Sequence, residues 1–371
     1  MKCMSTNNER LHIAYFITPH GFGHAARACA VMDALHRVKT GLVFEIFTTV
    51  PEWFFRESLD CKIVYHPFTS DVGLIQKSSM QEDIPRTLQH LNHYYPFAQE
   101  VIDGSCKILK EQNVKAVLCD ISPIAIEIAG KCNLPSVLIE NFTWDWIYAG
   151  YPRYQAQFNQ FIDGFQKAYT QVNYHIQTTP VCAPHEQVDF KSAPVSRVPR
   201  EKRGSVREKL GLNNHQTVAL VTMGGIPGEY SFIQELARYP LYQFIIPGAT
   251  DHISRQSNVI LLPHHSKFYH PDLVNASDLV IGKVGYSTLA ETYHANIPFI
   301  YLSRKSFRES ACLVDFVQQE MVGVEINEDQ FQSVQWMDVI SELLSKEKKT
   351  RSGQNGANQI AQFLLEHVLI N

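Results

Sequence analysis

The chain has 371 residues, enough for about two to three domains that each bury a core of their own. With 45% hydrophobic, 19% charged and 11% aromatic residues, its composition is close to that of average globular proteins and excludes a largely disordered chain. The 33 Lys and Arg against 37 Asp and Glu leave a net charge of −4, which argues against a protein that binds nucleic acid or an anionic membrane.

Strand-length hydrophobic runs alternate with helix-length amphipathic segments along the first half of the chain. This pattern is typical of parallel sheets whose faces are covered by helices. We predict strands at residues 11–17, 42–48, 62–66, 114–119, 136–139 and 172–177. After His24, the apolar residues Ala28, Val31, Leu35 and Val38 recur at helical spacing and predict a helix that packs on this sheet.

The alternation stops between Ala183 and Gly204, where three prolines and a cluster of basic residues break both kinds of element. Beyond this boundary we predict strands at residues 217–222, 241–246, 258–262, 278–281, 298–301 and 322–326, and a last helix over about 357–369. The expected fold is therefore α/β, with two doubly wound domains. The first covers residues 1–198 and is completed by 356–371, and the second covers 199–355.

The apolar runs of the chain are much shorter than the ~20 residues that span a bilayer, and residues 1–10 do not resemble a secretory signal. We therefore expect no membrane span and a cytoplasmic location. We also expect reduced, mostly buried thiols, because no C-x-x-C pair and no zinc spacing occurs among the eight cysteines, at positions 3, 29, 61, 106, 119, 132, 182 and 312. His264 and His265 are adjacent and cannot share one face of an element, which argues against a metal site there.

The first predicted strand leads through a glycine-rich turn, residues 18–27, directly into a helix. Ligands of open α/β sheets bind at such strand ends. Gly21-x-Gly23-x-x-Ala26 matches a relaxed dinucleotide fingerprint, but the second strand ends without the expected acidic residue. The turn could also be purely structural, with histidines that cap the helix. The remaining interpretation is that His20 or His24 accepts a proton from a substrate hydroxyl.

Two more glycine-rich turns follow strands of the second domain, at residues 222–228 and 282–291. Backbone N–H groups and a helix N-terminus can approach phosphate oxygens closely at such turns. Thr288-x-x-Glu291 has two interpretations, a capping box or a Glu291 carboxylate that accepts both hydroxyls of a ribose.

The segment from Asn141 to Tyr148 places Asp145 between Trp144 and Trp146. In a cleft these aromatic rings would stack on the apolar faces of a sugar, and elsewhere they would be core residues. The paired carboxylates of an Asp-x-Asp motif, which hold a divalent ion on a nucleotide sugar, are missing from the sequence. We therefore expect no metal in the mechanism.

Together these motifs resemble those of GT-B glycosyltransferases, which have two Rossmann-like domains facing a cleft. The turn with His24, followed eleven residues later by Leu35, is similar to that of the bacterial N-acetylglucosaminyltransferase of the peptidoglycan lipid precursor. Over about residues 11–326 the chain is more closely similar to the glycosyltransferase-like N-terminal region of plant L-arabinokinases. The shared motifs are His20-Gly-Phe-Gly-His24-Ala-x-Arg27, Asp71-x-Gly73-x-x-Gln76, Asn141-Phe-x-Trp144-Asp145-x-Ile147-Tyr148, Gly224-Gly225 and Gly282-Lys283-x-Gly285-Tyr286.

The resemblance implies a donor site for a nucleotide sugar, with UDP as the expected nucleotide and no cofactor. It assigns Gly224, Gly225 and Arg197 to the diphosphate, Glu291 to the ribose, and Arg308 and Glu309 to the donor sugar. It further assigns the leaving phosphate to the turn of Lys283, Gly285, Tyr286, Ser287 and Thr288. The glycine-serine ATP loop of the arabinokinase kinase domain does not occur here, so we do not expect kinase activity.

The resemblance places the acceptor, a small molecule, lipid or protein, in the first domain. We expect His24 to be the catalytic base, with His20 next and Asp71, Asp120 and Asp145 as alternative carboxylates for the base or for acceptor binding. Asp120, Trp144 and Trp146 are expected to bind the acceptor. Two other functions remain open, a nucleotide-sugar epimerase and a catalytically silent protein that senses nucleotide sugars.

Overall fold

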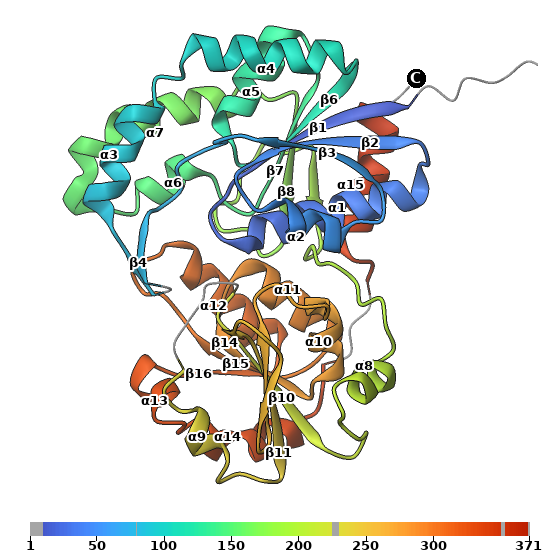
Figure 1. The fold of residues 1–371 in the computed structure, drawn as a ribbon. Helices are drawn as coiled ribbons and strands as arrows, with labels where there is room; N and C mark the ends of the chain where they lie inside the picture. The colour runs from blue at the N-terminus through green and yellow to red at the C-terminus, as the bar shows by residue number, and fades with distance from the viewer. Residues whose placement is uncertain (1–9, 79, 225–229, 350–352, 370–371) are drawn as a thin grey trace, which may run out of the picture.

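The computed structural model describes residues 10–78, 80–224, 230–349 and 353–369, which form two α/β units stacked one above the other (Figure 1). Each unit contains a seven-stranded sheet with helices on its two faces. This arrangement confirms the predicted α/β class. The long strands form where the sequence has continuous apolar runs, because both faces of a parallel sheet are buried.

The first sheet is parallel throughout, with the strand order β3-β2-β1-β6-β7-β8-β9. Its strands are β1 (Leu11–Ile17), β2 (Leu42–Thr48), β3 (Lys62–Pro67), β6 (Val114–Asp120), β7 (Ser136–Glu140), β8 (Tyr174–Thr178) and β9 (Phe190–Ser192). The helices of this unit are α1 (Phe22–Val38), α2 (Glu52–Ser58), α3 (Ile84–Tyr94), α4 (Gln99–Glu111), α5 (Pro123–Cys132), α6 (Trp144–Tyr148), η1 (Pro152–Tyr154) and α7 (Gln155–Tyr169). The strand order reverses between β1 and β6, so a crevice opens where these two strands end.

The second sheet has the order β12-β13-β11-β10-β14-β15-β16, and only the short edge strand β12 is antiparallel within the described part of it. Its strands are β10 (Thr217–Thr222), β11 (Tyr242–Thr250), β12 (Ser254–Gln256), β13 (Val259–Pro263), β14 (Leu279–Lys283), β15 (Phe299–Leu302) and β16 (Gly323–Glu325). The helices are α8 (Arg203–Lys209), α9 (Ile233–Leu236), α10 (His270–Ala276), α11 (Tyr286–Ala295), α12 (Glu309–Glu320), α13 (Glu328–Gln332) and α14 (Met337–Ser345). Here the reversal lies between β10 and β14.

Besides the linker between β9 and α8, two segments connect the units. Helix α15 (Gly356–Phe363), continued by η2 (Leu364–Val368), returns from the second unit and packs on α1 of the first (Figure 1). The hairpin of β4 (Gln76–Ser78) and β5 (Gln81–Glu82) extends from the first unit towards the second. Such strands of two or three residues carry too few alternating positions to be predicted from periodicity.

The expectation that every cysteine is reduced is wrong for one pair. Cys106 on α4 and Cys132 at the end of α5 form a disulfide, with their Cα atoms 5.8 Å apart. The two residues are 26 positions apart, and only the packing of α4 on α5 brings them together. The other cysteines in the described ranges, at positions 29, 61, 119, 182 and 312, are free. No helix of those ranges is long and apolar enough to cross a membrane.

Candidate functional site

Two neighbouring cavities lie between the units, and both reach the reversal points of the sheets. The aromatic cavity encloses an empty volume of about 800 Å³, and its apolar lining includes Phe22, Trp53, Phe54, Phe268 and Tyr269. The basic cavity encloses about 670 Å³, and its lining includes His20, His24, Arg27, Lys283 and Arg304. Phe22, Gly224, Ser287 and Thr288 line both cavities. Because they share these residues, the two cavities form one continuous site.

His24 is positioned by the turn between β1 and α1. Gly21 has a φ of +73°, a left-handed conformation that favours glycine, and it lets α1 begin at Phe22 directly after the strand. The last residue of β1, Ile17, pairs in register with Asp120, the last residue of the neighbouring strand β6. His24 therefore reaches Asp120, and His24 Nδ1 lies 2.6 Å from Asp120 Oδ1.

Asp120 is fully buried beneath His24. Burial alone would raise the pKa of Asp120, but the charge of Arg27 and the hydrogen bonds from His24 and Arg27 hold this pKa below its usual value. An ionised Asp120 accepts the hydrogen bond of His24 Nδ1–H, and in the neutral tautomer that makes this bond Nε2 is the nitrogen without a proton. Within the described ranges Nε2 makes no hydrogen bond, and the His24 ring lines the basic cavity. His24 is thus arranged to accept a proton.

Asp120 was predicted to bind an acceptor, but its carboxylate is occupied by residues of its own unit. Arg27 donates to both oxygens, from Nε over 2.8 Å and from Nη2 over 2.9 Å. Arg27 Nη1 also donates to Asn141 Oδ1 over 2.5 Å, and Asn141 Nδ2 donates to Glu309 Oε1 over 2.8 Å. Because Glu309 begins α12, this network connects the His24 pair to the second unit.

His20 lines the same cavity but is held differently. Its Nδ1 accepts from the Leu74 backbone N–H at 3.4 Å, and its Nε2 lies 3.3 Å from the side-chain nitrogen of Gln76. Burial, and then the charge of Arg304, lower the pKa of His20 well below its usual value. His20 is therefore neutral, and its Nδ1 lone pair is already used. Between the two histidines, the geometry favours His24 as the base.

On the second unit, the reversal point brings Gly224 and Lys283 together. A Cβ atom on Gly224 would lie 3.6 Å from Lys283 Cε, and this glycine has a φ of +71°. Lys283 is 9% exposed, and its side chain has no hydrogen bond or ion pair with any residue that the structure describes. Burial, followed by the charge of Arg304, lowers the pKa of Lys283 to about 7. Gly225, which was predicted beside Gly224, lies outside the described residues.

Helix α11 starts at Tyr286 with Gly285 as its N-cap, and no side chain caps it. Thr288 is the third helical residue rather than the N-cap, so the capping-box interpretation of Thr288 and Glu291 is wrong. The backbone N–H groups of the first turn have no partner within the helix and carry its positive end. Because Ser287 and Thr288 line both cavities, these groups can hold an anion where the cavities meet.

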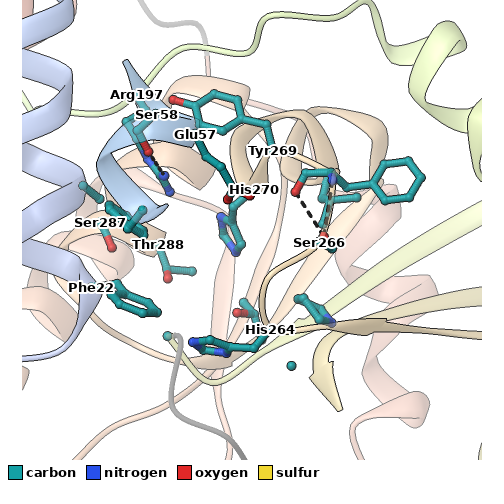
Figure 2. Close-up of a pocket in the computed structure, with 18 of the residues that line it drawn as sticks. Phe22, Glu57, Ser58, Arg197, His264, Ser266, Tyr269, His270, Ser287 and Thr288 are labelled. Atoms are coloured by element: carbon teal, nitrogen blue, oxygen red, sulfur yellow. Dashed lines mark hydrogen bonds between the residues drawn. The ribbon is translucent and has the colours of Figure 1, made fainter. Parts of the chain in front are cut away.

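Glu291, predicted to bind ribose, is buried and has both oxygens occupied. Oε1 accepts from Arg197 Nε over 3.0 Å, and Oε2 lies 2.8 Å from His270 Nδ1. Burial alone would raise the pKa of Glu291, but Arg197 and His270 hold this pKa below its usual value. Figure 2 shows the part of the aromatic cavity lined by Arg197, His270, Tyr269, Phe22, His264, Ser287 and Thr288. The Arg197 charge, predicted for a diphosphate, is thus balanced by Glu291.

Several predicted residues are not among those that line either cavity in the described structure. Asp71 is buried, accepts from Thr18 Oγ1 over 2.6 Å, and has its pKa raised by burial to about 7. Trp144 is fully buried and packs edge-on against His20, with 5.4 Å between ring centroids. The pKa of Asp145, on α6, is raised by burial. All three residues therefore lie outside the cavities, and Trp144 packs against a residue that lines one of them.

Trp146 and Arg308 contact each other outside the cavities. The Arg308 guanidinium lies 4.0 Å from the centroid of the Trp146 ring, and its Nη1 donates to the Trp146 carbonyl over 2.7 Å. The pair connects α6 with the N-cap of α12, so both residues make a contact between the units. Of the predicted pair Arg308 and Glu309, only Glu309 lines the basic cavity.

The sequence analysis missed Arg304, Phe307, and the aromatic residues on α2 and just before α10 that line the cavities. Arg304 follows the end of β15, so the rule that ligands bind at strand ends would have indicated it. The aromatic residues carry no such signal, because aromatic side chains are more often part of a core than of a binding site. Within the described ranges, no three His, Cys, Asp or Glu side chains are grouped as metal ligands.

No protein-family profile matches the chain. Among curated proteins, it is 26% identical over 370 residues to L-arabinokinase from Arabidopsis thaliana. The alignment covers 98% of this chain and 35% of the arabinokinase, so the chain spans about a third of that protein's length.

Three solved structures show the same fold. A UDP-glucosyltransferase from Polygonum tinctorium has a TM-score of 0.58 and 12% identity, and the match covers 97% of this chain and 94% of that one. UGT71G1 from Medicago truncatula, complexed with UDP-glucose, also has a TM-score of 0.58 and 12% identity, covering 99% and 96%. The glycosyltransferase SnogD from Streptomyces nogalater has a TM-score of 0.56 and 14% identity, covering 96% and 99%. The fold is GT-B, as the sequence motifs predicted.

Proposed function

We propose that this protein transfers a sugar from a nucleotide sugar, with UDP as the nucleotide, to an acceptor hydroxyl without a metal ion. One observation carries the proposal. His24, held by Asp120 behind it, and the uncapped start of α11 with Lys283 line the same cavity from opposite units. A proton acceptor and a site for a leaving anion are the two groups that glycosyl transfer needs.

The donor would extend through both cavities. Its nucleoside fits the aromatic cavity, where Trp53, Phe54 and Tyr269 offer rings to a base or ribose. Its diphosphate fits the region that the cavities share, beside Gly224, Ser287 and Thr288. The transferred sugar then lies in the basic cavity, next to His24.

The reaction would be a single displacement. His24 Nε2 takes the proton of the acceptor hydroxyl while the acceptor oxygen bonds to the anomeric carbon. The bond from that carbon to the diphosphate oxygen breaks, and the diphosphate leaves with the bonding electrons. Lys283 and the start of α11 stabilise its charge, and Asp120 stabilises the protonated His24. Displacement from one side inverts the anomeric configuration.

The proposal is tested by titrating the purified protein with UDP in a calorimeter and by incubating it with UDP-sugars and candidate acceptors. A transferase binds UDP and releases it with formation of a new glycoside. Conversion of the sugar within an intact UDP-sugar would instead identify an epimerase, and binding without any conversion would identify a sensor. Absence of UDP binding would overturn the donor site itself. The acceptor, whether small molecule, lipid or protein, and the cytoplasmic location remain predictions.

A further inference from the structure

The basic cavity holds a second buried cation that the diphosphate does not account for. Arg304 is 6% exposed and, like that of Lys283, its side chain makes no hydrogen bond with any residue in the described ranges. Its Nη1 lies 3.6 Å from Glu82 Oε1, which is an ion pair without a hydrogen bond. Buried guanidinium groups normally satisfy their donors, so a free set of N–H groups beside a cavity indicates a missing acceptor.

Arg304 is fixed in place without using its donors. The guanidinium carbon lies 4.0 Å from the centroid of the Phe307 ring, an arrangement in which the ring attracts the cation. Glu82, its carboxylate neighbour from the hairpin, accepts its own hydrogen bond from Ser306 Oγ over 2.7 Å. The planar guanidinium of Arg304 is therefore positioned by its neighbours, and its N–H groups are available to a ligand.

Three other charged groups of the cavity have a partner or a proposed role. Arg27 is balanced by Asp120, and the Glu309 carboxylate accepts from Asn141. Lys283 ends β14 and stands beside Gly224 and the start of α11, where the diphosphate is proposed. Arg304 follows the neighbouring strand β15 and lies on the side of the hairpin. The cavity thus offers Arg304 to a part of the ligand beyond the diphosphate.

We infer that Arg304 binds a carboxylate on the sugar that is transferred, so that the donor is a nucleoside diphosphate uronate. The inference rests on the proposed function, because it takes the donor to lie in the basic cavity. A carboxylate matches the planar arginine fork with two parallel hydrogen bonds. A neutral sugar would leave the buried guanidinium with the charges of Glu82 and Glu309 nearby but without an acceptor for its hydrogen bonds.

The test compares UDP, UDP-glucose and UDP-glucuronate by calorimetry, with the wild-type protein and with an Arg304→Gln/Glu82→Gln variant. The double substitution removes both members of the buried pair, so neither charge is left alone. We expect wild type to bind UDP-glucuronate about 10- to 100-fold more tightly than UDP-glucose, the range expected for hydrogen bonds between charged groups. In the variant this preference should disappear, while UDP still binds, which shows that the variant is folded. Lys305→Gln, which removes an exposed charge from the same loop, is the matched control and should keep the preference.

The other outcomes overturn specific parts of the argument. If UDP binds but UDP-glucuronate is not preferred, the uronate inference is wrong and the proposed donor site stands. If UDP does not bind, the proposed function fails and the inference fails with it. A preference that persists in the double variant would exclude Arg304 as the carboxylate ligand. If free glucuronate binds the UDP-saturated protein while UDP-glucuronate is not preferred, the carboxylate belongs to the acceptor and the donor assignment is wrong.

Discussion

A histidine in a glycine-rich turn becomes a specific proton acceptor only through its partner. The hydrogen bond between His24 Nδ1 and Asp120 favours one neutral tautomer, with Nε2 as the nitrogen without a proton, on a residue that lines the basic cavity. Arg27 keeps Asp120 ionised by donating to both carboxylate oxygens. The chemistry at this position therefore depends on three side chains rather than on one.

Replacing His24 with alanine should lower kcat by about 10²- to 10⁴-fold, which is the usual contribution of a general base. UDP affinity should change little, because the proposed diphosphate site is on the second unit. Steady-state kinetics and UDP calorimetry on the same preparation measure both quantities. His93→Ala, an exposed histidine at the end of α3, serves as the control and should leave kcat unaltered. Normal turnover in His24→Ala would move the base to another residue.

Lys283 should make UDP binding depend on pH near neutrality. Its pKa of about 7 in the empty protein means that the ammonium form, which attracts the diphosphate, is lost as the pH rises above 7. The dissociation constant for UDP should therefore increase by up to about tenfold per pH unit above pH 7, until the pKa of the UDP-bound protein is reached. Calorimetry between pH 7 and about 8.5 in wild type and Lys283→Met measures this, and the variant should lose the dependence. A flat profile in wild type would exclude Lys283 as a diphosphate ligand.

At the scale of elements, Glu291 connects three segments of the chain. It lies on α11, pairs with His270 at the start of α10, and pairs with Arg197 in the linker between the sheets. Arg197 also lies between the rings of Phe54 and Tyr269, 5.1 Å from each centroid. These contacts hold the linker against the aromatic cavity and give Glu291 a structural role whether or not it meets a ribose.

Removing Glu291 should therefore affect folding first. Glu291→Ala leaves the Arg197 charge buried without a partner, and breaking such a pair costs about 3–5 kcal/mol. Urea denaturation measures this loss, and the double variant Glu291→Leu/Arg197→Met should recover much of it. If Glu291→Ala kept wild-type stability but bound UDP with about 1–3 kcal/mol less free energy, the ribose interpretation from the sequence would be correct.

At the scale of the whole molecule, the two units pack against each other around the proposed site. The core beneath α1 continues through α11 into the second sheet, and α15 returns to pack on α1. The chain from Arg27 through Asn141 to Glu309 adds polar contacts between the units. Proton acceptance and leaving-group stabilisation thus come from different units, and the reaction needs both of them in contact.

Because protein groups are proposed to stabilise the leaving diphosphate, we predict that turnover survives EDTA. The charge of the leaving diphosphate would be met by Lys283 and the first turn of α11 rather than by a divalent ion. UDP release measured with and without EDTA should give the same rate, within the scatter of the assay. Loss of turnover on chelation, with recovery on addition of Mg²⁺ or Mn²⁺, would contradict the metal-free mechanism.

The sequence by itself determined the fold class and the position of the turns. Buried parallel strands such as 11–17 and 217–222 are continuous apolar runs, which neighbouring residues alone reveal. The glycine-rich turns with His24 and Lys283 were recognisable for the same reason, because each motif is local.

Only the tertiary structure decided which charges meet. His24 and Asp120 are 96 positions apart, and Arg197 and Glu291 are 94 apart. Adjacent strand ends bring the first pair together, and the path of the linker over α11 brings the second. In the structure Asp120 holds His24, although the sequence predicted that it binds an acceptor. Arg197 pairs with Glu291, and the Arg304 side chain has no hydrogen-bond partner in the described chain. Charge pairing depends on distance in space, and sequence separation carries almost no information about that distance.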